Sequence, residues 1–378
     1  MGMIGKGSRE RSPSEKAAGA GRLLLPEVDF SHLRRLTDET GLLQHARGTV
    51  PNREHGYCTD DNARALIVAT LATREPARAA GLDDLAVRYL SFLQHAFNRK
   101  RRVFRNLMSY DRRWSEPAGS TDSNGRAVWA LGVAAAKYPD ERLRRMATDL
   151  LLESLPALEA ATDLRAIAFA ALGLAAARTR GMGGSVDELL ERLCDRLLAA
   201  FAEGAGDDSW PWPEEVLTYA NARLPHALIE AGARAGREGG AAQGLRALEW
   251  LVEVQTEDGC FSPVGNRGWY RRGGKRARFD QQPIEADAMV AACAAALRAT
   301  GEAIWGDRAA LALRWFLGRN VVGEPLYDAA TGGCRDGLGA GGSNENQGAE
   351  STLSWLSALL IMRALRHEGV LREEAGTS

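Results

Sequence analysis

The stretch Gly56-Tyr57-Cys58-Thr59-Asp60-Asp61-Asn62-Ala63-Arg64-Ala65-Leu66 is short and polar, and it runs directly into an apolar segment. Its core is an acid followed by Asn-x-Arg and then by Ala and Leu. The same pattern returns at Asp122-Ser123-Asn124-Gly125-Arg126-Ala127, and in part at Tyr219-Ala220-Asn221-Ala222-Arg223-Leu224. We interpret these copies as equivalent positions of an internal helical repeat, whose polar starts converge on one site.

The rest of the chain predicts helices in two alternating kinds. Ala, Leu and Arg dominate, and the Val-Ile-Thr alternation of strands is scarce. Amphipathic segments, the first from Ser31 to His45, alternate with segments that are apolar on nearly every side. The apolar segments begin near Asp61, Asn124, Asp163, Asn221, Glu285 and Glu350.

A helix that is apolar on all sides must be covered on all sides. The alternation therefore predicts an all-α protein, in which six inner helices are wrapped by six outer helices as an (α/α)6 toroid. An open solenoid of helix pairs is the alternative, but it favours a uniform repeat length. The inner starts lie roughly 40 to 65 residues apart, and this unevenness favours the toroid.

Four long connections lead from outer to inner helices, at 99–121, 204–218, 256–282 and 320–347. We expect them all on one face of the toroid, with small hairpins such as one about Gly273-Gly274. Long loops in compact domains are usually functional, so this face should hold the site. The predicted domains are a disordered tail at 1–27, one toroid at 28–367 and a C-terminal tail at 368–378.

Composition narrows the class of protein. The 378 residues are 45% hydrophobic and carry 48 basic and 49 acidic side chains, so no net field favours nucleic acid or an anionic membrane. Five scattered cysteines without a CxxC pair indicate reduced thiols and a cytoplasmic protein. No apolar run is long enough to span a membrane. Phosphate-loop, dinucleotide and HExxH motifs do not occur, and we expect no metal and no cofactor.

Polar residues of three kinds gather at the predicted inner helix starts. Carboxylates there serve as helix caps in most proteins, but a ring of acids around one funnel raises some pKa values and keeps one group protonated as a general acid. Aromatic rings such as Trp269 either anchor loops or stack on a sugar. Amides and guanidiniums either bind hydroxyls or orient the acids through ion pairs. We interpret Asp60 as a helix cap and Asp61 as the residue for chemistry.

The catalytic candidates are Asp61, Glu285, Glu350, Asp122 and Glu215. The candidates for substrate binding are Asp60, Asn62, Arg64, Asn124, Arg126, Trp210, Trp212, Tyr219, Asn221, Arg223, Gln282, Asn346 and Gln347.

Several of these motifs together resemble a bacterial family of six-hairpin glycosidase-like proteins. The matching stretches are Tyr57 to Leu66, Asp122 to Gly132, Trp210-Pro211-Trp212, Gln282 to Ala286 and Asn346 to Thr352. The resemblance covers about Val28 to Leu365 and implies the toroid fold. Members are often labelled glycosyltransferase because the module also occurs behind a glycosyltransferase domain, so the resemblance implies a possible association with such an enzyme. This chain shows no βαβ alternation of its own. Ala220 stands where the family pattern leads us to expect an acid.

The sequence thus predicts a carbohydrate-active enzyme, most simply an inverting glycoside hydrolase acting on a bacterial oligosaccharide or polysaccharide with paired carboxylates. A sugar epimerase on the same fold is an alternative, but it would need histidines in the funnel. A non-catalytic carbohydrate-binding or scaffolding module is another, in which aromatics matter and acids do not. A peptide-binding toroid predicts an apolar funnel instead.

Overall fold

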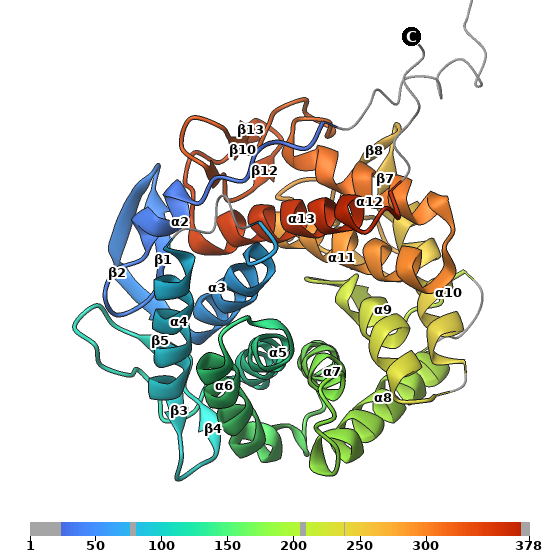
Figure 1. Cartoon of the computed structure of the whole chain (residues 1–378). Helices are drawn as coiled ribbons and strands as arrows, with labels where there is room; N and C mark the ends of the chain where they lie inside the picture. Colours follow the sequence, from blue (N-terminus) through green and yellow to red (C-terminus); the bar gives the residue numbers. More distant parts are fainter. Residues whose placement is uncertain (1–23, 76–80, 205–208, 238, 372–378) are drawn as a thin grey trace, which may run out of the picture.

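Six helices form a closed inner ring in the computed structural model, which describes residues 24–75, 81–204, 209–237 and 239–371. Each inner helix contacts the next one, and the last contacts the first, so the ring closes (Figure 1). The predicted toroid is therefore confirmed and the open solenoid is excluded. The inner helices are α3 (Thr59–Ala72), α5 (Thr121–Lys137), α7 (Leu164–Arg178), α9 (Arg223–Ala227), which continues as the π-helical turn η3 (Leu228–Gly232), α11 (Pro283–Thr300) and α13 (Ala349–His367).

Six outer helices cover this ring, each packed on the inner helix of its own hairpin. The sixth hairpin joins the two ends of the described chain, because α2 packs on α13. The outer helices are α2 (Ser31–Leu36), α4 (Leu82–Ala96), α6 (Glu141–Ser154), which runs into a short 3-10 turn, η2 (Leu155–Leu158), then α8 (Ser185–Gly204), α10 (Gly240–Val254) and α12 (Ala303–Phe316).

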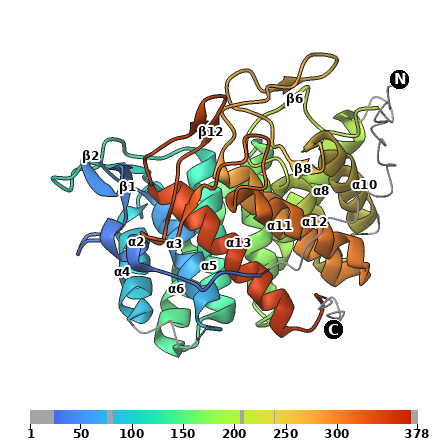
Figure 2. The same ribbon diagram turned by 90° about the horizontal axis from the view of Figure 1, so that it is seen from above.

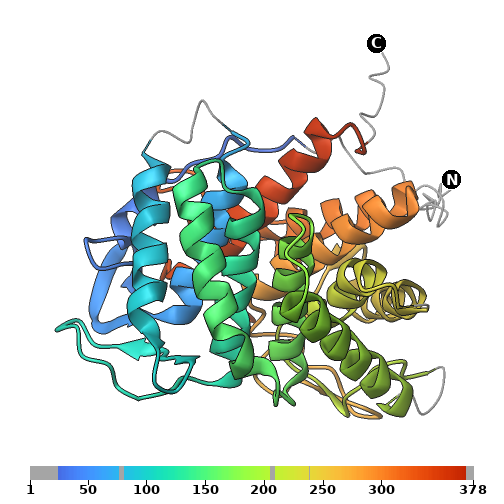
Figure 3. The same cartoon turned by 60° about the horizontal axis from the view of Figure 1, so that its bottom comes forward.

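Small β-elements gather with the long connections at one end of the ring, the end at which the inner helices begin (Figures 2 and 3). The largest is an antiparallel three-stranded sheet in the order β1-β2-β5. Its strands are β1 (Leu43–Arg47), β2 (Val50–Cys58) and β5 (Leu107–Met108). The other antiparallel pairs are β3 (Phe97–Asn98) with β4 (Val103–Phe104), β6 (Val216–Leu217) with β9 (Tyr270–Arg271), β7 (Thr256–Glu257) with β8 (Cys260–Phe261), β10 (Tyr327–Asp328) with β11 (Gly333–Cys334) and β12 (Leu338–Gly339) with β13 (Gly342–Ser343).

Two predictions about local structure were wrong. The helix predicted from Ser31 to His45 ends at Leu36, because Asp38 turns the chain by accepting hydrogen bonds from the backbone N–H groups of Thr40 and Gly41. The following residues form β1. The strand predicted before Gly273-Gly274 exists as β9, but it pairs with β6 instead of with the residues after the turn.

Most of the two predicted tails, at 1–23 and 372–378, lies outside the described residues. Glu368, which we placed in the C-terminal tail, forms ion pairs with Arg74 and Arg298 of the toroid. In the described part of the chain, no helix is long and apolar enough to cross a membrane.

Glycine allows the inner helices α5 and α7 to touch along their backbones. A Cβ atom at Gly132 would lie 2.1 Å from the carbonyl oxygen of Gly173, and one at Gly173 would lie 2.5 Å from that of Val128. Both neighbours are backbone atoms, which cannot rotate away. Any side chain at these positions must therefore push two inner helices apart.

We predict that Gly173→Ala lowers the free energy of unfolding by about 1–3 kcal/mol, the usual cost of overpacking. The loss should appear although Ala favours a helix over Gly by about 1 kcal/mol. Gly232→Ala is the matched control, because a Cβ atom there would meet Gly240 Cα at an ordinary 3.5 Å. Urea denaturation measures both variants, and a Gly173→Ala protein as stable as the wild type would refute the close contact.

Candidate active site

A polar cavity of about 600 Å³ opens at the end of the ring where the inner helices begin. We call it the funnel. Its wall combines carboxylates, guanidiniums, amides, hydroxyls and two aromatic rings, contributed by helix starts and by long connections. It is lined by Asp60, Arg64, Ser120, Thr121, Asp122, Arg126, Asp163, Tyr219, Asn266, Trp269, Gln282, Ile284 and Glu350.

The structure brings seven of the eighteen predicted site residues to this wall: Asp60, Arg64, Asp122, Arg126, Tyr219, Gln282 and Glu350. Asp163 and Trp269 also belong to the predicted gathering of acids and aromatics. Sequence reasoning missed Ser120, Thr121, Asn266 and Ile284. Ser120 had a readable signal, because it caps α5 by accepting a hydrogen bond from the backbone N–H of Ser123.

The repeated Asn-x-Arg element is partly architecture. The Asn62 side chain donates to the carbonyl of Cys58 at 2.8 Å and accepts from the N–H of Leu42 at 3.0 Å, which ties α3 to the preceding loop. Asn124 repeats this arrangement in α5, with Phe104 N–H as its loop donor at 2.7 Å. Both amides are buried and neither lines the funnel.

The arginine two residues further on reaches the funnel in both copies. Arg64 bridges two carboxylates, with N–O distances of 2.7 Å to Asp61 and 2.7 Å to Glu350. Arg126 binds Asp122 through its Nε atom at 2.7 Å. The guanidiniums therefore orient the acids through ion pairs, which is one of the two roles predicted for them from the sequence.

The third copy of the element differs. Asn221 lies in a turn before α9. Its side chain accepts a hydrogen bond from the N–H of Thr218 and donates one to the carbonyl of the same residue. Arg223 begins α9 and pairs with Asp287, and it lines a different cavity toward the other end of the ring. Only two of the three copies are equivalent.

The two carboxylate oxygens of Asp60 lie in different surroundings. Its Oδ2 atom accepts from the Asn106 amide at 3.2 Å, but Oδ1 is buried and lacks a hydrogen-bond partner among the described residues. Burial raises the pKa of Asp60, and the nearby charge of Asp122 adds to this, while Arg126 and Arg64 oppose it. The interpretation of Asp60 as the helix cap was wrong, because Cys58 is the N-cap of α3.

Asp61 lies behind the funnel wall. It is 5% exposed, and its carboxylate accepts hydrogen bonds from Cys58 Sγ and from Arg64. Burial raises the pKa of Asp61, and Arg64 opposes the rise. Asp61 therefore holds Arg64 in place, whereas Asp60 faces the cavity.

Glu285 is also enclosed in the protein. Its carboxylate accepts hydrogen bonds from the backbone N–H groups of Ala220 and Asn221 and from the Asn221 side chain. Burial raises the pKa of Glu285 to about 7, against the effect of these bonds. The residue binds the turn before α9 to the start of α11.

The remaining predicted residues lie away from the funnel. The Glu215 side chain is 69% exposed beside Arg272. Trp210 and Trp212 pack against Trp250 in the core under the loops. Asn346 accepts a hydrogen bond from Gly48 N–H, and Gln347 is buried against Asp328 and Thr331.

The fold and the funnel define a six-hairpin (α/α)6 toroid with a carboxylate-rich cavity at the helix starts. Among solved structures, the chain is similar to a cellobiose 2-epimerase from Bacillus thermoamylovorans, with a TM-score of 0.69, 10% identity and coverage of 89% of this chain and 96% of that one. It is similar to a D-mannose isomerase, with a TM-score of 0.67, 10% identity and coverage of 88% and 95%. It is also similar to an α-mannanase of glycoside hydrolase family 76 from Bacteroides thetaiotaomicron, with a TM-score of 0.57, 12% identity and coverage of 83% of this chain and 87% of that one.

No protein-family model matches the chain, and no curated protein sequence matches it. At such low identities the structural likeness shows the fold alone: the chain has the toroid fold of six-hairpin glycosidase-like proteins, as its resemblance to that group implied. The association with a glycosyltransferase is supported by none of these findings and stays a prediction.

We predict that Glu285 gives the protein a pH-dependent stability. Because its folded-state pKa is raised from 4.5 to about 7, the folded protein holds a proton that the unfolded chain has lost between these values. The free energy of unfolding should therefore fall as pH rises through this window. Relative to Glu285→Gln, the wild type should lose up to about 1.4 kcal/mol per pH unit, as measured by urea denaturation at several pH values. If the difference in free energy of unfolding between the wild type and Glu285→Gln were constant over pH, the raised pKa of Glu285 would be refuted. Glu345→Gln, which replaces an exposed acid, is the control.

Proposed function

We propose that the chain is a carbohydrate-active enzyme, and specifically a glycoside hydrolase that acts in the funnel. The observation that supports this most directly is that two carboxylates of the funnel lie in contrasting environments. Asp60 has a buried, unpartnered oxygen and a raised pKa, whereas Glu350 is paired with Arg64 and its side chain is 41% exposed. Pairs of carboxyl groups in such contrasting environments serve as acid and base.

Asp60 takes the role of general acid in this proposal. Its protonated carboxyl group donates to the glycosidic oxygen as the bond to the anomeric carbon breaks. The sequence favours Asp61 for the chemistry, but both of its carboxylate oxygens accept hydrogen bonds from neighbouring side chains.

Glu350 takes the role of general base. Its Oε2 atom binds Arg64, and within the described part of the chain its Oε1 atom has no hydrogen-bond partner, so it can accept a proton from water. Asp122 suits this role less well, because Tyr219 and Arg126 occupy both of its oxygens. We propose that Asp122 and the two arginines hold the substrate and the acids in position.

The rest of the funnel fits an oligosaccharide. Trp269 and Tyr219 offer aromatic faces for the C–H surface of a sugar ring, and Asn266 and Gln282 offer amides for its hydroxyls. The similar structures include a cellobiose 2-epimerase, a D-mannose isomerase and an α-mannanase, which supports a sugar as the substrate class.

Epimerisation is the second candidate, because epimerases are among the similar structures. It would need a base for a carbon-bound proton, for which histidine is the usual group. No histidine lines the funnel in the part of the chain that the structure describes. We therefore propose hydrolysis, with inversion at the anomeric carbon as the simplest course for two carboxylates that act on opposite faces of the sugar.

We predict that Asp60→Asn and Glu350→Gln each lower kcat by roughly 10²- to 10⁴-fold, the usual contribution of acid–base catalysis. The proteins would be assayed on mannosides, glucosides and galactosides, and the product anomer followed by NMR. The rate of the wild type should fall as pH rises through the raised pKa of Asp60, because only the protonated form donates.

Glu345→Gln, an exposed acid in the connection before α13, is the control and should keep the wild-type rate. Turnover by both variants at that rate would rule out the assignment. A wild type that binds oligosaccharides but converts none would favour the non-catalytic module, and release of an epimer without hydrolysis would favour the epimerase.

A further inference from the structure

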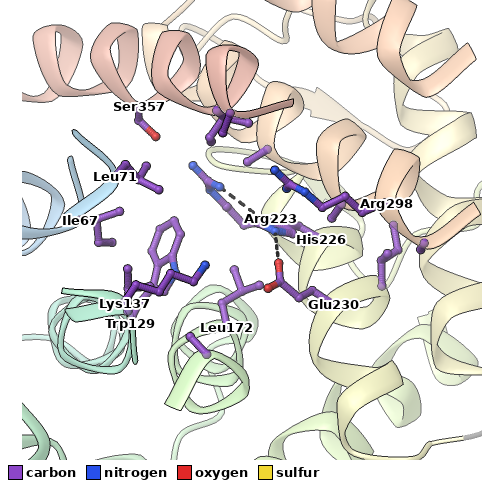
Figure 4. A pocket seen from close by; sticks show the side chains of 18 of the residues that line it. Ile67, Leu71, Trp129, Lys137, Leu172, Arg223, His226, Glu230, Arg298 and Ser357 are labelled. Carbon is purple, nitrogen blue, oxygen red and sulfur yellow. Dashed lines mark hydrogen bonds and ion pairs between the residues drawn. The ribbon is translucent and has the colours of Figure 1, made fainter. Parts of the chain in front are cut away.

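A second cavity, of about 500 Å³, occupies the lumen of the ring at the end opposite the funnel. We call it the lumen cavity. Side chains from all six inner helices point into it (Figure 4). The apolar part of its wall includes Ile67, Leu71, Val133, Leu172, Ile229 and Ile361.

The two cavities are separated by a stack of side chains. The Arg126 guanidinium, which lines the funnel, lies 4.1 Å from the ring centre of Phe169. Phe169 stacks on Trp129 with 5.6 Å between ring centres, and the Arg223 guanidinium lies 4.7 Å from the Trp129 ring. Trp129 and Arg223 line the lumen cavity, so a ligand there does not share the catalytic groups.

A chain of fixed polar groups begins at the floor of the lumen cavity. Arg223 pairs with Asp287. Arg223 also contacts Nδ1 of His226 at 3.4 Å, and Nε2 of His226 contacts Glu230 at 3.1 Å (Figure 4). Because the arginine can only donate, Nδ1 accepts and Nε2–H donates to Glu230. Burial lowers the pKa of His226, in keeping with a neutral ring.

Cations gather at the mouth of the lumen cavity. Lys137 is the last residue of α5, Arg298 lies in the last turn of α11, and Arg74 follows the end of α3. Arg74 and Arg298 share the carboxylate of Glu368, and Arg234 lies 3.6 Å from Glu230.

Lys137 stands apart from the other cations. It makes no hydrogen bond or ion pair with any described residue. Its charge is attracted by Glu230 and repelled by the arginines around it. Five cationic side chains line the cavity, namely Arg74, Lys137, Arg223, Arg234 and Arg298. Three carboxylates offset part of this charge: Glu230 and Glu368 of the lining, and Asp287, which pairs with Arg223. The net charge is therefore +2.

Helix C-termini attract basic residues in any protein, and this alone would explain why cations lie at the mouth. It does not explain the open space behind them. Alanines line that space at positions 176, 233, 291, 295, 299 and 364, where larger side chains would fill the lumen. An apolar pocket of roughly 300–1,000 Å³ with a few convergent polar groups is typical of a small-molecule site.

We propose that the lumen cavity binds a small amphipathic anion, whose carboxylate or phosphate group pairs with Lys137 at the mouth and whose apolar body fills the lumen above Trp129. The uncompensated charge selects an anion, and the isoleucine and leucine wall selects an aliphatic or aromatic body. This site is independent of the activity in the funnel.

The test uses isothermal titration of the full chain with octyl phosphate, octanoate and octan-1-ol. We expect the two anions to bind, and octan-1-ol, which has the same chain without charge, to bind at least roughly tenfold more weakly. Tighter binding of octyl phosphate or of octanoate would identify the preferred head group. Equal affinity for octan-1-ol, or no binding of either anion, would overturn the proposal.

Three variants locate the ligand. Lys137→Met keeps an unbranched side chain that is one atom shorter but removes the charge, and it should weaken anion binding by roughly tenfold or more, whereas Lys137→Arg should retain it. Ala295→Phe fills the lumen and should abolish binding, with thermal unfolding as the check on its fold. Lys100→Met, an exposed lysine between β3 and β4, is the control and should bind as the wild type does. Unchanged binding by Lys137→Met would place the anion elsewhere and refute the site.

Discussion

A helix that is apolar on every side can exist only where protein covers every side of it, and this constraint organises the whole molecule. In α7 every residue from Arg165 to Ala177 is buried. Neighbouring inner helices cover the flanks, and an outer helix covers the back. A ring of six such helices must close, and it leaves the charged groups of α3, α5 and α7 at or near the helix ends. Both cavities lie there, so the burial that makes the toroid also decides where polar cavities can form.

The toroid could be read from the sequence because its signal is periodic and local. Every predicted inner start lies within three residues of the observed one, from Thr59 in α3 to Ala349 in α13. The choice between Asp60 and Asp61 could not be read in the same way. Successive residues of a helix point about 100° apart, so one of two adjacent acids faces the cavity and the other faces the wall. That choice depends on the rotation of α3, which its packing against α4, α5 and α13 sets.

Partners far apart in the sequence explain the rest of what could not be predicted. Glu285 looked like a funnel acid because it opens an inner helix, as Glu350 does. Its carboxylate instead binds backbone groups 64 and 65 residues earlier in the chain. The sequence predicts that Trp210 and Trp212 bind a sugar, because tryptophan is unusual in polar loops. In the structure both rings pack against Trp250 of α10. A buried partner on another element leaves no local pattern.

The absence of an acid at Ala220 looks at first like a lost catalytic group. The structure gives this position another meaning, because Ala220 is fully buried against Phe169 and Ile284. Its backbone takes a left-handed φ of 48° and donates its N–H to Glu285. A carboxylate on this residue would enter an apolar cluster beside a second carboxylate, where burial and repulsion both oppose ionisation. The funnel wall beside it is formed by Tyr219, whose hydroxyl donates to Asp122 at 3.0 Å. Alanine at 220 therefore removes no carboxylate from the funnel, whose acids come from the starts of α3, α5, α7 and α13: Asp60, Asp122, Asp163 and Glu350.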